Sequence, residues 1–367
     1  MKLFVLQENL QQVVQDLQRN IPHKPSLPVL SCIYVTANEN NTIMFSATDL
    51  QIGIRSSIQG RVIEKGIAAI PAKIFIDYVS TLSAGEIEIN LSGTSLTVQG
   101  KGSHAVISCF SPTDYPAFPE KDGEEVLLPI ELFTPLVQNT TFSSSADEAR
   151  PILTSVLLAL GEKTEVVATD GFRLSRLLLN FTHPTQQLLL PAKALNEVLR
   201  IAQRKKVESV SFYVSEKLKQ VFFSFAEVDV IVRLMEGEFP PYQKIIPSDF
   251  QTEVIFDGGE LAQKMKTALI FARESSGIIR FQVKGEELHI ISSSTTFGNQ
   301  ESTLPLRVLK GGDQEIAFNA KYVVDFLTVL KPETIWFGMN ESLKPAVFRP
   351  EGMLDYEYVV MPFRVNQ

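Results

Sequence analysis

Six stretches of the chain carry apolar residues at the three- and four-residue spacing of an amphipathic helix. Between them lie short runs of alternating or β-branched residues, which predict strands. Strand-forming runs outnumber helical ones, so we predict an α+β fold with antiparallel sheet and two helices in each third of the chain. The predicted helices are 10–17, 75–82, 132–139, 194–204, 261–273 and 321–330; the predicted strands are 33–36, 42–45, 86–90, 95–98, 105–109, 165–168, 209–214, 220–225, 228–234, 277–283, 287–291 and 356–360.

The same short strings return along the chain at a fixed spacing. Pro-Ala-Lys at 71–73 precedes a helical pattern, and Pro-Ala-Lys at 191–193 precedes another 120 residues later. Ala-Thr-Asp at 47–49 and 168–170, and Phe-Pro at 118–119 and 239–240, are both 121 residues apart. A third helix opens with Asn-Ala-Lys at 319–321. The repeats predict three copies of one unit, with domains at 1–122, 123–248 and 249–367.

Composition narrows the class of protein. Lys and Arg number 34 and Asp and Glu 42, a net charge of −8, which excludes a protein that is basic all over but allows a local basic surface. Hydrophobic residues make up 44% and charged residues 21%, as in ordinary globular proteins. Cys32 and Cys109 are the only cysteines and lie far apart, which excludes a disulfide framework and fits a reducing, cytoplasmic compartment. No apolar run is long enough for a signal sequence or a membrane span.

Motifs for catalysis are scarce. The four histidines stand singly, and no phosphate-binding glycine loop or serine elbow occurs. Asp49 and Asp170 are the best enzymatic candidates, because each ends a predicted strand and carboxylates can hold two metal ions. The alternative is that each aspartate stabilises a turn after its strand. We predict no catalytic residue, no metal site and no cofactor.

Positive charge is concentrated on predicted helices. Residues 191–206 carry five basic side chains and one acidic one, within a chain of net charge −8. Lys193, Arg200 and Arg204 share one helical face, and residues 260–273 are also net positive. This is either a solvated face or a surface that follows phosphates without reading bases.

Four strings resemble one family. They are Lys-Pro-Ser-Leu-Pro-Val-Leu at 24–30, Ala-Thr-Asp-Gly-Phe-Arg-Leu at 168–174, Glu-Gly-Glu-Phe-Pro-Pro-Tyr at 236–242 and Tyr-Val-Val-Met-Pro-Phe-Arg at 358–364. They resemble the bacterial sliding clamps, the beta subunits of DNA polymerase III, in order and over essentially the whole chain. The resemblance implies three clamp domains per chain and a head-to-tail homodimer that forms a six-domain ring around duplex DNA. Helices would line its inner wall, and sheets would form its outer surface.

The function that the resemblance implies is non-catalytic. The ring would tether the polymerase to DNA and so confer processivity. It would also recruit the clamp loader, other polymerases and mismatch-repair proteins, whose short motifs of Gln, Leu and Phe would enter an apolar pocket between the second and third domains, with Arg and Lys at its rim. The rival hypotheses are a metal-dependent nuclease or phosphohydrolase using Asp49 and Asp170, and a monomeric peptide-binding scaffold without DNA.

The resemblance also implies roles for individual residues. At four positions the chain departs from the usual family residue: Lys24 and Lys244 replace Arg, Phe172 replaces His, and Ala105 replaces a larger apolar residue. The implied DNA-facing residues are Lys24, Lys73, Lys193, Arg200, Arg204, Lys264, Lys266 and Lys321. The implied pocket residues are Leu153, Thr169, Gly171, Phe172, Arg173, Leu174, Pro240, Lys244, Ile245, Val347, Val359, Met361, Pro362, Phe363 and Arg364. The implied dimer contact joins Ala105 and Ile107 to Ile270 and Phe271 of the partner chain.

Overall fold

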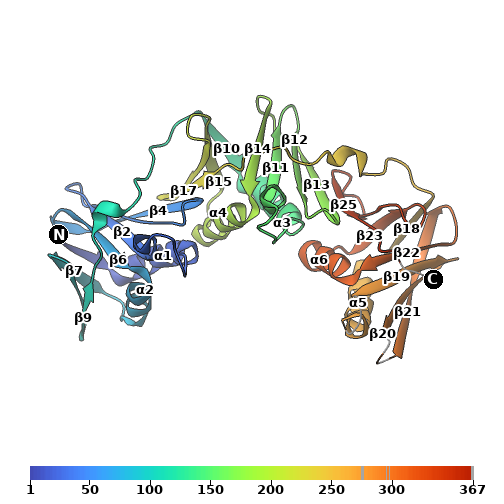
Figure 1. Cartoon of the computed structure of the whole chain (residues 1–367), viewed down its shortest axis with the longest axis horizontal. Coiled ribbons are helices and arrows are strands. Elements are labelled where there is room, and N and C mark those ends of the chain that lie inside the picture. Colours follow the sequence, from blue (N-terminus) through green and yellow to red (C-terminus); the bar gives the residue numbers. More distant parts are fainter. Residues whose placement is uncertain (274–276, 295, 297, 365–367) are drawn as a thin grey trace. The chain divides into compact units, whose positions relative to one another are not determined.

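The computed structural model describes residues 1–273, 277–294, 296 and 298–364 (Figure 1). The chain folds into two compact units. Unit 1 contains residues 1–133 and 197–234, and unit 2 contains residues 134–196 and 235–367. The central third of the sequence is therefore shared between the units.

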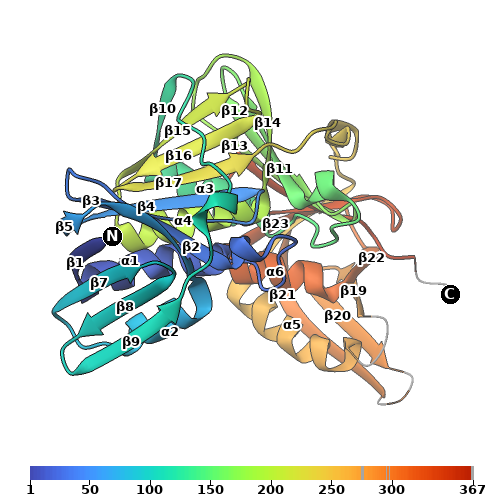
Figure 2. The same cartoon turned by 60° about the vertical axis from the view of Figure 1, so that its left-hand side comes forward.

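Unit 1 contains two antiparallel sheets. The five-stranded sheet has the order β5 (Arg61–Glu64), β1 (Lys2–Leu6), β7 (Glu86–Ser92), β8 (Ser95–Gly100) and β9 (Ser103–Ser108). The eight-stranded sheet has the order β10 (Glu125–Pro129), β15 (Ser209–Ser215), β16 (Gln220–Phe225), β17 (Val228–Arg233), β4 (Ile52–Gln59), β3 (Thr42–Thr48), β2 (Cys32–Ala37) and β6 (Gly66–Pro71). Strands from the first and second thirds of the sequence thus form one sheet, which Figure 2 shows from the side of unit 1.

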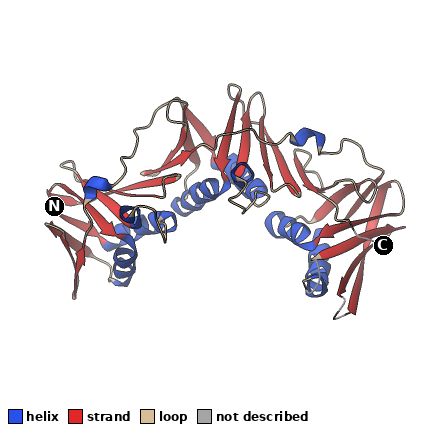
Figure 3. Ribbon diagram, in the orientation of Figure 1, coloured by secondary structure: helices blue, strands red, loops and turns tan. Residues whose placement is uncertain are grey.

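Helices α1 (Gln7–Leu17) and α2 (Ala72–Thr81) pack side by side on one side of the unit 1 sheets (Figure 3). Helix α1 buries Leu10, Val13, Val14 and Leu17 completely, at the spacing of one helical face. Helix α4 (Ala192–Lys205) lies with its C-terminal part in unit 1, where Val198, Leu199, Ile201 and Ala202 are buried. The apolar stripes predicted from sequence are therefore the surfaces that cover the sheets.

Unit 2 contains one continuous antiparallel sheet of twelve strands. Helices α5 (Gly258–Ala272) and α6 (Ala320–Leu330) pack against each other in this unit, and α3 (Ile130–Thr141) contributes its C-terminal part. The strand order is β14 (Gln186–Pro191), β11 (Ser155–Leu160), β12 (Thr164–Thr169), β13 (Arg173–Leu179), β25 (Tyr356–Val360), β24 (Ala346–Pro350), β23 (Thr334–Met339), β18 (Thr252–Asp257), β21 (Gly298–Lys310), β20 (Glu287–Ser294), β19 (Ile278–Lys284) and β22 (Gln314–Asn319).

A cluster of aromatic rings fills part of the unit 2 core. Phe281, Phe318, Phe326, Phe337 and Phe348 are completely buried. Their rings meet mostly edge to face or tilted, with centroids as close as 4.6 Å between Phe337 and Phe348. These geometries bring ring edges onto neighbouring faces, the favoured arrangement for aromatic pairs. The cluster ties α6 to the strands beneath it.

The structure confirms all six predicted helices and places each predicted strand within an observed one or one residue beyond its end. The prediction missed many of the observed strands, including β1, whose burial alternates, and β11 and β14, whose burial does not. β11, with the sequence Ser-Val-Leu-Leu-Ala-Leu, is buried at nearly every position, so its sequence lacks the alternation of a half-exposed strand. β14 was missed for the same reason.

The repeated Ala-Thr-Asp strings form the same turn twice. Asp49 Oδ1 accepts the N–H groups of Gln51 and Ile52 at 3.0 and 2.8 Å. Asp170 Oδ1 accepts the equivalent N–H groups of Phe172 and Arg173 at 2.8 and 3.0 Å. The turn-stabilising interpretation of both aspartates is therefore confirmed, and it explains why they recur without invoking a reaction.

The repeat also appears in the way that one domain copy joins the next. In unit 1, β4 of the first copy pairs antiparallel with β17 of the second. In unit 2, β13 of the second copy pairs in the same manner with β25 of the third. In both junctions the strand after the Asp turn pairs with the last strand of the neighbouring copy.

Candidate functional site: an apolar pocket and a set of basic side chains

A cavity of about 140 Å³ lies in unit 2, next to the β13–β25 junction. Its walls come from four places: the 3₁₀ helix Pro151–Thr154, the Asp170 turn with the start of β13, the end of β25, and the segment around the short 3₁₀ helix Tyr242–Lys244. Its lining residues are Leu153, Thr169, Gly171, Arg173, Leu174, Pro240, Tyr242, Ile245, Val359 and Met361.

The apolar floor of the cavity belongs to the hydrophobic core. Leu174 and Val359 are opposite each other on β13 and β25 and are nearly fully buried. Tyr242 is buried as well, and its hydroxyl donates a hydrogen bond to Glu165 at 2.7 Å. Burial and this hydrogen bond both raise the pKa of the Tyr242 hydroxyl. The floor and this wall are therefore held rigidly before any ligand arrives.

The Asp170 turn sets the rim. Gly171 has φ of +92°, a conformation that side chains with a Cβ rarely adopt, although a Cβ there would meet nothing within 4 Å. Thr169 Oγ1 accepts the Gly171 N–H at 3.0 Å and donates to the Arg173 carbonyl at 2.6 Å. The glycine is thus required by the backbone rather than by crowding, and the turn is closed by side-chain hydrogen bonds.

Arg173 lines the cavity but is neutralised within unit 2. Only 7% of its side chain is exposed, and it contacts Asp170 Oδ2 at 3.0 Å and Asp325 Oδ2 at 2.5 Å. Its guanidinium also lies 4.9 Å from the Tyr322 ring centroid. Burial disfavours the charge on Arg173, but Tyr358, Asp325 and Asp170 outweigh burial and raise the pKa of the guanidinium. Arg173 therefore fastens β13 to α6 and does not stand free at a rim.

Nine of the ten lining residues are among those that the resemblance implied, and Tyr242 is the one it missed. Tyr242 ends the Glu-Gly-Glu-Phe-Pro-Pro-Tyr string at 236–242, so the resemblance of this string to sliding clamps could have identified it. Val347 is fully buried in the core beneath the cavity, and Phe172 and Lys244 are exposed beside it. Pro362 is half-buried, whereas Phe363 and Arg364 are exposed; none of these three lines the cavity.

The predicted basic residues differ in their surroundings. Lys24, Lys73, Lys193, Lys266 and Lys321 are exposed. Lys264 is half-buried, with Nζ 3.9 Å from Glu260 on the preceding turn of α5. Arg200 and Arg204 are half-buried and make ion pairs within unit 1. The predicted basic residues therefore differ in exposure: five lysines are exposed, whereas Lys264, Arg200 and Arg204 are half-buried.

The two arginines belong to a buried network between α1 and α4. Asp16 on α1 is completely buried, forms an ion pair with Arg204, lies 3.6 Å from Lys205 Nζ, and accepts a hydrogen bond from Ser56 at 3.0 Å. Burial and the neighbouring Arg204 lower the pKa of Lys205. Arg200 Nε contacts both carboxylate oxygens of Glu197 at 3.0 Å, and its Nη2 donates to main-chain carbonyls of α1. Sequence reasoning missed Asp16, because nothing near it in the sequence marks its partners.

The residues expected at a dimer contact lie on β9 and α5. β9 is an edge strand of its sheet. Ile107 on β9 is buried, Ala105 is half-buried, and the intervening Val106 is 58% exposed. On α5, Ile270 is 66% exposed and Phe271 is half-buried. Ile270 thus presents an apolar side chain outward, whereas Ile107 packs into its own sheet and leaves Val106 facing outward.

Neither a metal centre nor a membrane segment emerges from the described residues. Among them, no three His, Cys, Asp or Glu side chains converge as metal ligands would. Asp170, one of the enzymatic candidates, is instead paired with Arg173. No helix in the described part of the chain has both the length and the apolar character needed to cross a bilayer.

Comparison with known proteins gives one consistent result. Three family models match in succession: the N-terminal, central and C-terminal domains of the DNA polymerase III beta subunit match residues 1–119, 127–241 and 243–364. Two proteins named beta sliding clamp, from Synechocystis and Chlamydia pneumoniae, are 29% and 28% identical, and each alignment covers 100% of both chains.

Solved structures give the same fold. The DNA polymerase sliding clamp of Bacillus subtilis matches with a TM-score of 0.93 at 24% identity, over 100% of both chains. The beta subunit from Thermotoga maritima matches with a TM-score of 0.93 at 22% identity, again over 100% of both chains. The matched domains follow the same order as the internal repeats, so the chain belongs to the family of bacterial beta sliding clamps, the non-catalytic beta subunits of DNA polymerase III.

Proposed function

We propose that two copies of this chain join head to tail into a closed ring that encircles duplex DNA and slides along it. Within one chain, the first domain copy is joined to the second, and the second to the third, by the same strand pairing. In each case the strand that follows the Asp turn of one copy pairs with the last strand of the next copy. A closed ring of two such chains needs the same junction once more at each subunit boundary, because heterologous contacts can close symmetrically. This recurring junction is the observation that carries the proposal.

Among the described residues, the strands for the remaining junction are unpaired on one side. β9 is the last strand of the first copy and an edge strand of its sheet. Residues 298–304 of β21 pair only with β20 among the described residues, and they occupy the position in the third copy that β4 and β13 hold in the others. We assign the dimer seam to β9 of one chain and this part of β21 of the other, with Ala105, Ile107, Ile270 and Phe271 contributing apolar contacts. Val106 joins this set because of its exposure.

DNA would be held through phosphates rather than bases. Exposed lysines on flexible stems form exchangeable contacts, which sliding requires. Lys24, Lys73, Lys193, Lys266 and Lys321 are the strongest of the expected contacts because they are exposed, whereas Arg200, Arg204 and Lys264 are half-buried. Encirclement keeps the polymerase at high effective concentration without tight binding.

The unit 2 cavity is proposed as the docking site for partner peptides. Its apolar floor suits the hydrophobic anchors of an extended segment, and the exposed Phe172 and Lys244 flank it. We propose that the polymerase, the clamp loader, other polymerases and mismatch-repair proteins compete for this site in the cytoplasm. The three clamp domains are proposed to span 1–122, 123–248 and 249–367.

A topological experiment tests encirclement. The protein is loaded by its cognate clamp loader with ATP onto nicked circular DNA, the complex is isolated, and the DNA is then linearised. Retention on the circle and release from the linear form are expected. Equal retention on both forms would mean that ordinary contacts hold the protein, and the ring mechanism would be wrong.

A substitution tests the pocket. Ile245 is 39% exposed at the cavity, so Ile245→Asp should fold and place a charge against the apolar anchors. We expect at least a tenfold loss of affinity for a labelled peptide of Gln, Leu and Phe, about 1.4 kcal/mol, measured by fluorescence polarisation. Ile63→Asp, at a 57% exposed site in unit 1, is the matched control and should bind as wild type does. Equal affinities for all three proteins would place the peptide site elsewhere.

A further inference from the structure

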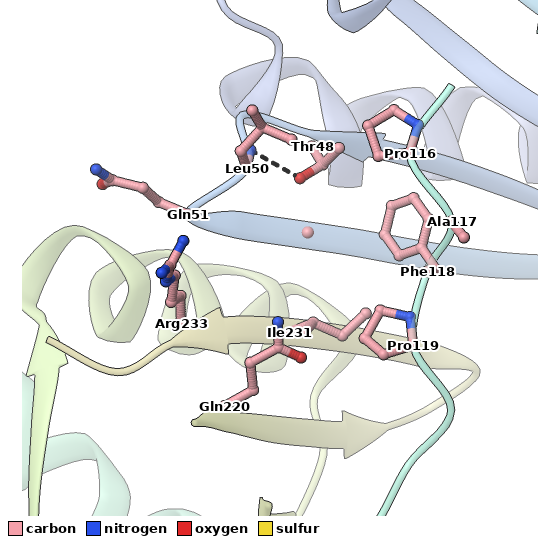
Figure 4. A pocket seen from close by; sticks show the side chains of 11 residues that line it. Thr48, Leu50, Gln51, Pro116, Ala117, Phe118, Pro119, Gln220, Ile231 and Arg233 are labelled. Atoms are coloured by element: carbon pink, nitrogen blue, oxygen red, sulfur yellow. Dashed lines mark hydrogen bonds between the residues drawn. The ribbon is translucent and has the colours of Figure 1, made fainter. Parts of the chain in front are cut away.

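A second cavity lies in unit 1, next to the β4–β17 junction, and has about the same size, 150 Å³ (Figure 4). It is formed by the Asp49 turn with the start of β4, by strands β16 and β17, and by the segment 116–119. Its lining residues are Thr48, Leu50, Gln51, Gly53, Pro116, Ala117, Phe118, Pro119, Gln220, Ile231 and Arg233. A cavity of about this volume admits a benzene-sized group.

This cavity is the repeat counterpart of the unit 2 pocket. Thr48 and Thr169 hold the same position in the two Asp turns, and each accepts an N–H bond two residues ahead at 3.0 Å. Phe-Pro at 118–119 corresponds to Phe-Pro at 239–240, which contributes Pro240 to the other pocket. A cavity of similar size and construction therefore lies beside each of the two junctions between domain copies, β4–β17 and β13–β25.

One wall of the unit 1 cavity is an aromatic ring held in place. A Cβ on Gly53 would lie 2.8 Å from Phe118, so the ring packs directly onto β4, where the other copy has Leu174. Arg55, also on β4, lies over this ring, 5.4 Å from its centroid, and donates to the Pro119 carbonyl at 3.4 Å. The apolar end of the cavity is thus preorganised.

The opposite end is polar and differs from the unit 2 pocket in charge. Figure 4 shows Arg233 and Gln51 at this end, away from Phe118 and Pro119. The arginine in the unit 2 pocket, Arg173, is neutralised by two aspartates, whereas no carboxylate oxygen among the described residues lies within 4 Å of the exposed Arg233. Gln220 adds a shielded Oε1 atom that receives no hydrogen bond from the described chain. A ligand with a carboxylate and an N–H donor would satisfy both groups.

We propose that the unit 1 cavity binds an extended segment of a partner protein, with an apolar side chain at one position and an Asp or Glu side chain two residues later. In an extended chain, residues i and i+2 point to the same side. The apolar side chain enters between Phe118 and Ile231, the carboxylate pairs with Arg233, and a backbone N–H donates to Gln220. This site is separate from the peptide pocket of unit 2 and differs from it in selecting a carboxylate.

The test uses blocked tripeptides and the full-length protein with labelled isoleucine methyl groups. The probe is N-acetyl-Phe-Ala-Asp-amide, and its isosteric neutral control is N-acetyl-Phe-Ala-Asn-amide. N-acetyl-Phe-Asp-Ala-amide places the two side chains on opposite sides and serves as the spacing control. The Ile231 methyl resonance reports this cavity, and the Ile245 methyl resonance reports the unit 2 pocket. Binding at the unit 1 cavity and binding at the unit 2 pocket are therefore measured by different resonances, and the failure of one proposal can be distinguished from the failure of the other.

We expect the Phe-Ala-Asp probe to shift the Ile231 resonance in a saturable manner, and both control peptides to bind about tenfold more weakly. Arg233→Gln should remove the preference for Asp over Asn without moving the Ile245 response. Arg61→Gln, an exposed arginine elsewhere in unit 1, should retain the preference. An Ile231 resonance that does not move, equal binding of all three peptides, or an Asp preference that survives Arg233→Gln would each overturn the proposal.

Discussion

Asp16 gives the most direct test of the packing between α1 and α4. Its side chain is completely buried, and it is the carboxylate partner of Arg204 and of Lys205. Asp16→Asn preserves the size of the side chain and a hydrogen-bond acceptor for Ser56. It removes the negative charge and replaces one acceptor oxygen with an NH2 donor, and so leaves two neighbouring cations without their anionic partner.

The magnitude follows from burial. Removing one partner of a buried ion pair costs about 3–5 kcal/mol, because the other charge stays desolvated. The Arg204 and Lys205 side chains are still 26% and 18% exposed, so water solvates their charges in part and reduces the free-energy cost. We therefore expect unit 1 to lose about 2–3 kcal/mol of unfolding free energy. In a unit of this size that lowers the melting temperature by roughly 5–10 °C.

Thermal unfolding, followed by circular dichroism at one fixed protein concentration, measures the effect, since an oligomer melts at a concentration-dependent temperature. Glu39→Gln is the control: it breaks an ion pair with Lys65 in the same unit, but both side chains are exposed, so about 0.5 kcal/mol or less is expected. A melting temperature for Asp16→Asn no lower than that of the control would refute the argument that this carboxylate balances buried charge.

Three further predictions follow from single features. Gly258→Ala should cost at least about 3 kcal/mol of unfolding free energy, because its Cβ would lie 2.0 Å from the Pro332 carbonyl oxygen. Gly312→Ala is the control, since its Cβ would meet nothing within 4 Å. Equal losses of unfolding free energy for the two variants in a denaturant titration would contradict this prediction. Burial raises the pKa of Cys109 from 9.0 to about 11, so less of its thiolate is present at pH 8. Iodoacetamide should therefore modify Cys109 about 100-fold more slowly than it modifies a cysteine in an unfolded peptide. Equal rates of modification, measured by mass spectrometry, would contradict this prediction. If Phe271 lies at the dimer seam, Phe271→Ala should speed subunit exchange about tenfold in a fluorescence energy-transfer assay, and an unchanged rate would remove it from the seam.

The helices and the threefold repeat were predictable from sequence for local reasons. An amphipathic helix repeats its apolar positions every three to four residues, so the stripe on α1 is visible without a partner. The Asp49 and Asp170 turns are equally local, since each aspartate bonds N–H groups two and three residues ahead. The string around the Asp170 turn was one of the four that carried the resemblance to sliding clamps, and that resemblance implied most of the unit 2 pocket.

What the side chains do depends on partners that are distant in sequence, and only the tertiary structure supplied these. The sequence places Arg200 and Arg204 on one helical face with Lys193, but folding half-buries both arginines and brings Asp16 against Arg204, whereas Lys193 stays exposed. Likewise Arg233 and Phe118 face one cavity because β4 and β17, from different domain copies, pair in one sheet. Periodicity depends on neighbours along the chain, whereas charge balance and cavities depend on which strands and helices meet in space.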